Sequence, residues 1–303
     1  MSENKLAAEA LPWWAPTSFE HELSGQSFDA ERALYHSTAL KVSACHFGGP
    51  VDGESALKES SNFLVEDSTF AMRYVMWHDT NFIMRNCTFN EETRAPLWYD
   101  QHGLIENCKL HSVKNLRECH DLIVRNCDID SEEFGWKCSD IVLTDSSLNS
   151  VYAFLESKNL TLKNVKATGK YAFQYVENAV IEDSSIETKD LLWHAKNVTV
   201  KNCTISTEYF AWYSDGLTLI NCHIKSLQPL CYCKNLKLIN CTMEHADRAF
   251  EYSQLDATIK GHVDSIKNPL SGSISCDSLG ELITSDQVRP CQCAVVVAGN
   301  KLL

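Results

Sequence analysis

The chain has 303 residues, with 27 Lys and Arg against 40 Asp and Glu, which gives a net charge of −13. A charge this negative disfavours nucleic acid as a partner, because phosphate binding needs clustered Lys and Arg. It fits a neutral or cationic ligand, or it serves solubility alone. No stretch approaches the roughly 18 apolar residues of a membrane span. Met1–Trp14 lacks a secretory signal pattern, so we expect a cytoplasmic protein with reduced thiols and no membrane contact.

A single polar position repeats through the chain from Ser61 to Ser253. Its members lie 19 residues apart, except for one step of 21 residues. A fixed period of this length is typical of solenoids, whose repeats stack into one elongated domain. The members are Asp67, Asn86, Asn107, Asn126, Asp145, Asn164, Asp183, Asn202, Asn221 and Asn240.

The segment Lys196–Ser214 shows the pattern of one coil, numbered here from position 1 to position 19. Positions 3 and 5 are apolar with polar neighbours, which is the alternation of a β-strand. Position 7 is the Asn/Asp position, and these residues suit a sharp left-handed bend. Position 8 is small or Cys and is expected to point inward. Position 10 is apolar, and a turn and a third strand follow. Three short strands in each coil predict an all-β, right-handed, single-stranded parallel β-helix of about 12 coils.

Irregular segments at both ends predict caps, because an open solenoid end exposes unpaired strands and core. We expect an N-terminal cap or tail at residues 1–17, a β-helix domain at 18–285 and a C-terminal cap or tail at 286–303. Leu6–Leu11 suits a short helix, and Trp13 and Trp14 are expected to lie over the first coil.

The third strand carries an unusual set of side chains when its positions are counted back from the end of each coil. Position 16 is never charged, so it is expected to face the core. Position 17 carries Lys, Arg and five of the seven tryptophans, so it is expected to face outward, and position 18 is aromatic or titratable in every coil. The predicted binding face consists of Trp77, Trp98, Trp136, Trp193, Trp212, His78, Tyr99, His194, Tyr213 and Tyr232.

Exposed aromatic patches mark binding sites, because Trp and Tyr stack on sugars or pack in protein interfaces. Three interpretations stay open: a ligand groove, self-association into a homo-oligomer, or cover by a terminal segment. Asp190 and Glu208 lie on adjacent coils beside Trp193 and Trp212. Carboxylates about 5 Å apart can share the acid and nucleophile roles of glycoside cleavage. The pair is a weak catalytic candidate, because turns are commonly charged and stacked coils bring any such pair together.

No cofactor or metal site is expected. The histidines lack ligand spacing, the Cys-x-Cys pairs lack the two-residue spacer of zinc knuckles, and no Gly-rich phosphate loop occurs.

The coil pattern resembles the pectin-lyase-like right-handed β-helix proteins. Several segments between about residues 19 and 285 are similar to an uncharacterised bacterial β-helix family, a domain of unknown function: Glu31–Leu34, Gly53–Lys58, Lys189–Trp193, Glu208–Trp212, Gln228–Tyr232, Ala249–Ser253 and Lys267–Pro269. The resemblance implies a fold and no reaction. Pectate-lyase relatives use clustered aspartates for calcium and an arginine base, and Asp67 and Asp79 match only part of such a cluster.

Two hypotheses follow for function, and whether the chain is an enzyme stays open. The first is a carbohydrate-binding or carbohydrate-processing β-helix that uses the Trp/Tyr/His/Glu face. The second is a non-catalytic scaffold that uses the same face for protein contact or self-association.

Overall fold

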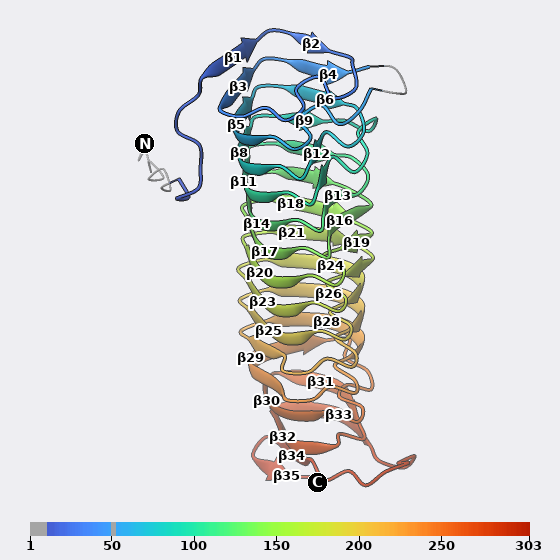
Figure 1. The fold of residues 1–303 in the computed structure, drawn as a ribbon. Helices are drawn as coiled ribbons and strands as arrows, with labels where there is room; N and C mark the ends of the chain where they lie inside the picture. The colour runs from blue at the N-terminus through green and yellow to red at the C-terminus, as the bar shows by residue number, and fades with distance from the viewer. Residues whose placement is uncertain (1–10, 50–52) are drawn as a thin grey trace, which may run out of the picture.

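The computed structural model describes residues 11–49 and 53–303. These residues form about 14 turns of a parallel β-solenoid and contain no helix (Figure 1). The predicted all-β parallel β-helix with coils of roughly 19 residues is confirmed. The number of turns is slightly larger than predicted, because the irregular segments near both ends also coil. In the described part of the chain, no helix is long and apolar enough to cross a membrane.

The first strands of successive coils stack into one long parallel ladder. Each residue pairs with the residue one coil later, as Ile105 pairs with Val124 and Val124 with Leu143, and all three are fully buried. The ladder consists of β1 (His21–Ser24), β3 (Leu40–Ser43), β5 (Ser61–Glu66), β8 (Thr80–Arg85), β11 (Gln101–Glu106), β14 (His120–Arg125), β17 (Ser139–Thr144), β20 (Lys158–Lys163), β23 (Glu177–Glu182), β25 (Lys196–Lys201), β27 (Thr218–Ile220), β29 (Leu236–Glu244), β30 (Gln254–Lys260), β32 (Ser271–Cys276) and β34 (Ala294–Val297).

The second strands stack in the same way on another side of the solenoid. They are β2 (Ser27–Phe28), β4 (His46–Gly48), β6 (Thr69–Ala71), β9 (Thr88–Phe89), β12 (Lys109–His111), β15 (Asp128–Asp130), β18 (Ser147–Ser150), β21 (Lys166–Gly169), β24 (Ser185–Leu191), β26 (Thr204–Phe210), β28 (His223–Pro229), β31 (His262–Lys267) and β33 (Ser278–Ile283).

The third strand is shorter and less regular than the sequence predicts. It exists as a separate small sheet made of β7 (Met76–Trp77), β10 (Leu97–Trp98), β13 (Asn115–Arg117), β16 (Glu133–Trp136) and β19 (Tyr152–Ala153), and β22 (Tyr171–Ala172) continues it. In later coils the second strand lengthens instead, and a tight turn follows it, as after Leu191. The prediction of a third strand in every coil is therefore wrong for the later coils.

Position 7 has the predicted left-handed backbone at every member of the ladder, with φ between 51° and 56°. The side chains also bond from coil to coil: the Asn126 amide donates to Asn107 Oδ1 at 2.6 Å, and Asn164 donates to Asp145 Oδ1 at 2.6 Å. A second ladder with the same backbone runs through position 2, where Asn178 donates to Asn159 at 3.2 Å. Sequence reasoning missed this second ladder, which contains His102 and Gly216 among its Asn and Asp members.

The core lies inside the coils and repeats with them. Position 10 contributes a column of stacked phenylalanines, with Phe47 and Phe70 4.8 Å apart and Phe70 and Phe89 4.7 Å apart between ring centroids. The position-8 cysteines point inward and are buried, as predicted. Burial of complete apolar columns is the main source of stability in such a stack.

The N-terminal segment does not lie over the first coil, which corrects the predicted placement of Trp13 and Trp14. It runs down the outside of the first-strand ladder (Figure 1), and Trp14 packs on a stripe formed by Leu64, Ile83 and Leu104. The stripe is apolar and faces outward, and Trp14 is buried against it. The helix expected at Leu6–Leu11 lies, except for its last residue, outside the described residues. At the C-terminal end, β34 pairs with the antiparallel β35 (Asn300–Lys301).

Candidate functional site

Positions 16 to 18 orient as the sequence predicts, with position 16 inside and position 17 half-buried on the outer surface. Position 18 adopts left-handed backbone in all coils from His36 to Tyr252. Such backbone is unfavourable for aromatic residues, so other interactions must hold position 18 in place. The contacts between neighbouring coils supply them.

The first group of aromatic residues, the N-terminal aromatic patch, is Trp77, His78, Trp98, Tyr99 and Trp136. Trp77 and Trp98 stack with centroids 5.5 Å apart, and His78 stacks on Tyr99 at 4.9 Å. The Arg117 guanidinium lies between Trp98 and Trp136, 5.2 Å and 5.1 Å from their ring centroids. Arg117 therefore continues the column as a cation–π contact where a Trp is missing.

The second group, the C-terminal aromatic patch, is Tyr175, Trp193, His194, Trp212, Tyr213 and Tyr232. Trp193 and Trp212 stack at 5.3 Å with an angle of 6°. Along position 18, the centroid separations are 5.0 Å from Tyr175 to His194, 5.1 Å from His194 to Tyr213 and 4.8 Å from Tyr213 to Tyr232. Tyr175 and Tyr213 are 53% and 48% exposed, so ring edges of this column reach solvent.

The ten predicted face residues thus form two patches instead of one continuous row. Between them, position 18 carries Lys137 and Glu156, whose charged groups are 3.9 Å apart. Within each patch the rings use their faces to stack on one another, and the position-18 rings present edges with hydroxyl and imidazole groups. Sequence reasoning did not include Arg117 or Tyr175 in the face, although position 17 and position 18 mark both.

Asp190 is a buried carboxyl three residues before Trp193 of the C-terminal aromatic patch. It pairs in register with Tyr171 on one side and Tyr209 on the other, and it is only 8% exposed. Burial raises the pKa of Asp190, the Lys189 ammonium opposes this shift, and the charge of Glu208 adds to it. The neighbouring Tyr209 has a raised pKa, chiefly because its hydroxyl bonds Glu208. The structure thus brings the predicted pair Asp190 and Glu208 to adjacent coils with different surroundings.

Two buried polar atoms in this part of the chain have no hydrogen-bond partner, Asp190 Oδ1 and Trp193 Nε1. The equivalent indole of Trp212 donates to the carbonyl of Gln228 at 2.7 Å. By the same register, Trp193 Nε1 lies near the backbone of Tyr209, which is the strand partner of Asp190. Buried acceptors and donors without partners are unusual, and this part of the chain holds one of each.

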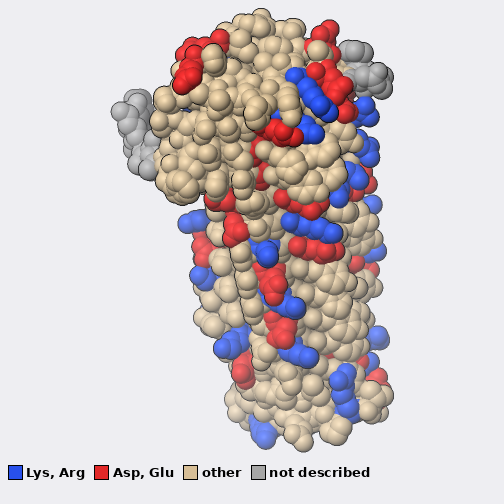
Figure 2. Space-filling view, in the orientation of Figure 1, with Lys and Arg blue, Asp and Glu red and all other residues tan. Residues whose placement is uncertain are grey.

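Terminal segments leave most of this face uncovered in the described part of the chain. The N-terminal segment lies on the first-strand ladder, and the C-terminal region reaches only Tyr252, which has the Arg289 guanidinium 4.4 Å from its ring. On the face shown in Figure 2, acidic and basic side chains alternate along the long axis. Among the described residues, no cluster of three or more His, Cys, Asp or Glu is placed to hold a metal ion. Asp67 and Asp79 are apart, since Asp67 is outside and Asp79 is in the core.

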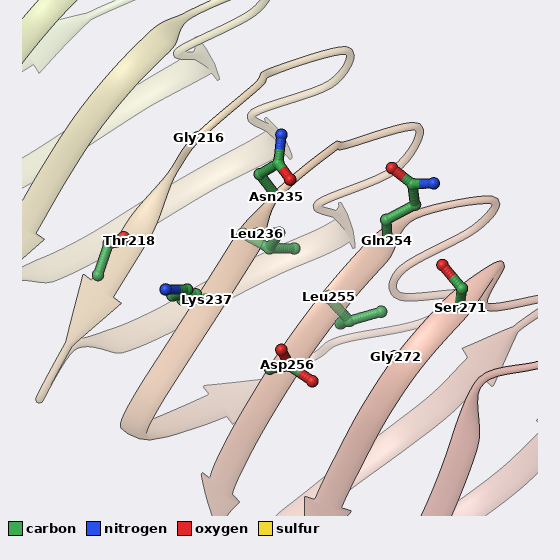
Figure 3. Close-up of a pocket in the computed structure, with 10 residues that line it drawn as sticks. All are labelled: Gly216, Thr218, Asn235, Leu236, Lys237, Gln254, Leu255, Asp256, Ser271 and Gly272. Atoms are coloured by element: carbon green, nitrogen blue, oxygen red, sulfur yellow. The ribbon is translucent and has the colours of Figure 1, made fainter.

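A separate shallow groove of about 500 Å³ crosses β27, β29, β30 and β32 on the first-strand ladder. Figure 3 shows Lys237 and Asp256 on neighbouring strands, with Gly216 and Gly272 where side chains would narrow the groove. This groove holds none of the unpartnered buried groups found near Asp190. It is therefore a weaker candidate than the aromatic patches.

The stacked coils define a parallel β-solenoid of the β-helix class. The chain belongs to a family of proteins of unknown function, DUF3737, whose model matches residues 21–296. No curated protein matches the chain.

Among solved structures, the fold is similar to the adhesin PfbA of Streptococcus pneumoniae (7% identity, TM-score 0.48, 90% of this chain and 91% of that chain). It is also similar to the A-module of the mannuronan C-5 epimerase AlgE6 of Azotobacter vinelandii (12% identity, TM-score 0.41, 93% of this chain and 90% of that chain). A third similar structure is a tailspike protein mutant of E. coli bacteriophage HK620 in complex with a hexasaccharide (12% identity, TM-score 0.38, 87% of this chain and 60% of that chain). Identity this low says nothing about the ligand or reaction of this chain.

Proposed function

We propose that this β-solenoid binds an elongated, uncharged glycan along the C-terminal aromatic patch. The observation that carries the proposal is the column Tyr175–His194–Tyr213–Tyr232, which offers one polar ring edge in each coil. A polymer with hydroxyl groups at regular intervals can bond such a row repeatedly. The net charge of −13 favours a neutral polymer over an acidic one.

The unpartnered groups of Asp190 and Trp193 support the same ligand. Sugar hydroxyls both donate and accept hydrogen bonds, so they can supply a donor to Asp190 Oδ1 and an acceptor to Trp193 Nε1. Both atoms are buried, so neighbouring side chains must shift to admit the ligand. Satisfying two buried groups would give this subsite high selectivity for a hydroxyl group.

A finer form of the proposal makes Asp190 and Glu208 a cleavage pair. A carboxyl group whose pKa is raised by burial can hold a proton near neutral pH and act as a general acid. Glu208 is then the candidate nucleophile or base. If the chain cleaves its glycan, Asp190→Asn abolishes turnover and leaves binding measurable.

The second candidate function is a protein-binding or self-associating scaffold. The observation in its favour is that the aromatic rings already stack on one another, so few ring faces are free to stack on a sugar. A flat array of ring edges also suits the surface of another protein.

The two functions differ in their need for the tyrosine hydroxyls. We would measure binding of the wild type to neutral oligosaccharides of glucose, mannose, galactose, xylose and N-acetylglucosamine, and repeat the measurement with Tyr175→Phe/Tyr213→Phe. Phenylalanine preserves the stack and removes two hydroxyls, so glycan affinity should fall about tenfold or more. The control is Tyr35→Phe, an exposed tyrosine far from the patch. Unchanged affinity in the double variant, or no binding by the wild type, would overturn the glycan proposal.

A further inference from the structure

The last residue of each coil, position 19, forms an inward column of small or polar side chains. Its polar members make the same two bonds in successive coils. Ser214 Oγ accepts from the amide of Ala195, position 19 one coil earlier, at 3.2 Å, and donates to the carbonyl of Leu192, position 16 one coil earlier, at 2.6 Å. Ser253 repeats the pattern with Cys233 and Leu230 at 2.9 Å and 2.6 Å. The column therefore requires a side chain that accepts one bond and donates another.

Cysteine fills the same role in other coils. The Cys233 thiol donates to the carbonyl of Ala211 at 3.0 Å, and the Cys138 thiol donates to the carbonyl of Leu116 at 3.3 Å. Ser60 also follows the rule, because it accepts from Ser37 at 3.1 Å and donates to Leu34 at 3.2 Å. The serine and cysteine side chains of position 19, from Ser60 to Ser253, thus donate to a carbonyl of position 16 in the preceding coil.

Asp79 and Asp100 occupy two neighbouring places in this column, and both are fully buried. Their Oδ1 atoms make the accepting bond: Ser60 donates to Asp79 at 2.7 Å, and Asp79 donates to Asp100 at 2.9 Å. Their Oδ2 atoms are buried without a hydrogen-bond partner. By the register of the column, the carbonyls that correspond to Leu192 and Leu230 are here those of Leu57 and Met76. An ionised carboxylate only accepts hydrogen bonds, whereas a protonated one donates through Oδ2.

We infer that Asp79 and Asp100 are held as neutral carboxylic acids that donate to the carbonyls of Leu57 and Met76, and that their ionisation at higher pH loosens the coils from Ser61 to Cys119. The chemistry is a simple proton loss from Oδ2 to water. The resulting carboxylate would face a carbonyl oxygen inside the core and would repel it.

The surroundings of the pair disfavour ionisation. Burial raises the pKa of both groups well above its usual range, and Asp100 raises the pKa of Asp79 further. The other titratable groups that act on them are Glu59, near Asp79, and the Cys119 thiol, next to Asp100 in the column. All of these groups become negative when they ionise, so none of them stabilises a carboxylate.

The sign of the pH effect follows directly. Because the folded pKa exceeds the unfolded value of about 3.9, the folded chain holds protons that the unfolded chain has released. The two protonated carboxyls therefore contribute their full stabilisation of the fold below the unfolded pKa, and this contribution is lost as pH rises through the folded pKa. The affected coils include Leu64, Ile83 and Leu104, the stripe that holds Trp14, so detachment of Trp14 is a local readout.

The test compares thermal unfolding of the wild type and Asp79→Asn/Asp100→Asn from pH 5 to pH 9. Asparagine keeps an acceptor and a donor but does not ionise. The wild-type Tm should fall with rising pH, and the variant should gain several degrees relative to it, since about 1 kcal/mol corresponds to roughly 2–4 °C at this size. Once exchange rates are corrected for the intrinsic rise of amide exchange with pH, protection at residues 11–20 should decrease with pH in the wild type alone.

Asp67→Asn/Asp145→Asn is the matched control, because it removes two carboxylates from the exposed position-7 ladder. Its Tm difference from the wild type should not grow with pH in this way. If the Asn variant does not fold, Asp79→Ser/Asp100→Ser installs the residue that the column uses elsewhere. The infrared spectrum at pH 7 gives a direct readout, a protonated carboxyl band that disappears in the variant. Absence of that band, together with parallel pH profiles, would overturn the inference.

Discussion

The position-7 ladder joins neighbouring coils through single side chains. Each bonded Asn amide donates to the oxygen of the rung before it, as Asn86 donates to Asp67 at 2.9 Å and Asn202 donates to Asp183 at 3.0 Å. Two aspartates never occupy neighbouring rungs of this ladder. The spacing keeps carboxylates apart while the amides supply the donors.

Asn164→Asp tests this arrangement, because residue 164 lies between Asp145 and Asp183. The change removes the donor to Asp145 and places three carboxylates in consecutive coils about 4.8 Å apart. Unfolding by denaturant at pH 7 should show a loss of about 1–2 kcal/mol. The loss should shrink below about pH 3, where the carboxyls are protonated.

Asn240→Asp makes the same chemical change beside Asn221, and its effect should be smaller. Equal losses in the two variants would show that the identity of the neighbouring rung does not matter.

For single residues, the sequence predicts the backbone conformation where the residue type itself favours that conformation. Asn and Asp at position 7 predicted left-handed bends correctly. Position 18 adopts the same left-handed backbone with Tyr, His, Glu and Lys. These residue types do not favour that conformation, so the sequence did not predict it. Stacking between coils overrides the local preference there. The sequence offered Asp79 only as a partial match to an aspartate cluster, and its inward orientation became evident only from its column.

Among the elements, the third strand shows how tertiary contacts change the pattern. Position 16 is left-handed from Leu116 onward, and strand-like at Met76 and Leu97. The apolar residues predicted its inward orientation in both cases. The sequence does not distinguish a strand from a turn at position 16, because Leu and Phe at this position fill the core in both conformations.

The position-19 column closes these turns, so a buried serine in it should matter more than an exposed one. Ser214→Ala removes the hydroxyl that bonds the Ala195 amide and the Leu192 carbonyl, and leaves these two groups only their long mutual bond of 3.4 Å. We expect the free energy of unfolding to fall by about 2–4 kcal/mol, because buried polar groups lose their bonds.

Ser185→Ala in β24 changes an exposed serine and should cost less than about 0.5 kcal/mol. A small loss at Ser214 as well would mean that water replaces the missing hydroxyl.

On the scale of the whole molecule, the N-terminal segment packs several coils away from β1, the strand that follows it in the chain. Trp14 is 6% exposed on the stripe of Leu64, Ile83 and Leu104, and it stacks on His102 with centroids 6.0 Å apart. The sequence predicted a cap from the two tryptophans but not its position, because an apolar stripe on the outside of the solenoid was not anticipated.

Trp14→Ala should release this segment without unfolding the solenoid. Burial of a large aromatic side chain contributes about 2–3 kcal/mol, and the loss should fall on the segment alone. Hydrogen exchange at residues 11–20 should accelerate while the midpoint of thermal unfolding changes little. Trp13→Ala is the control, since Trp13 is 87% exposed. Similar exchange in both variants would contradict the packing of Trp14.

The central claim is that the C-terminal aromatic patch is an open binding face and not an interface between copies of the chain. Light scattering of the wild type measures this most directly. We predict a single species of about 34.2 kDa, and the same mass for Tyr175→Arg/Tyr213→Arg, in which two large charges enter the patch. A wild-type dimer that this variant converts to monomers would contradict the claim and would make the patch a site of self-association.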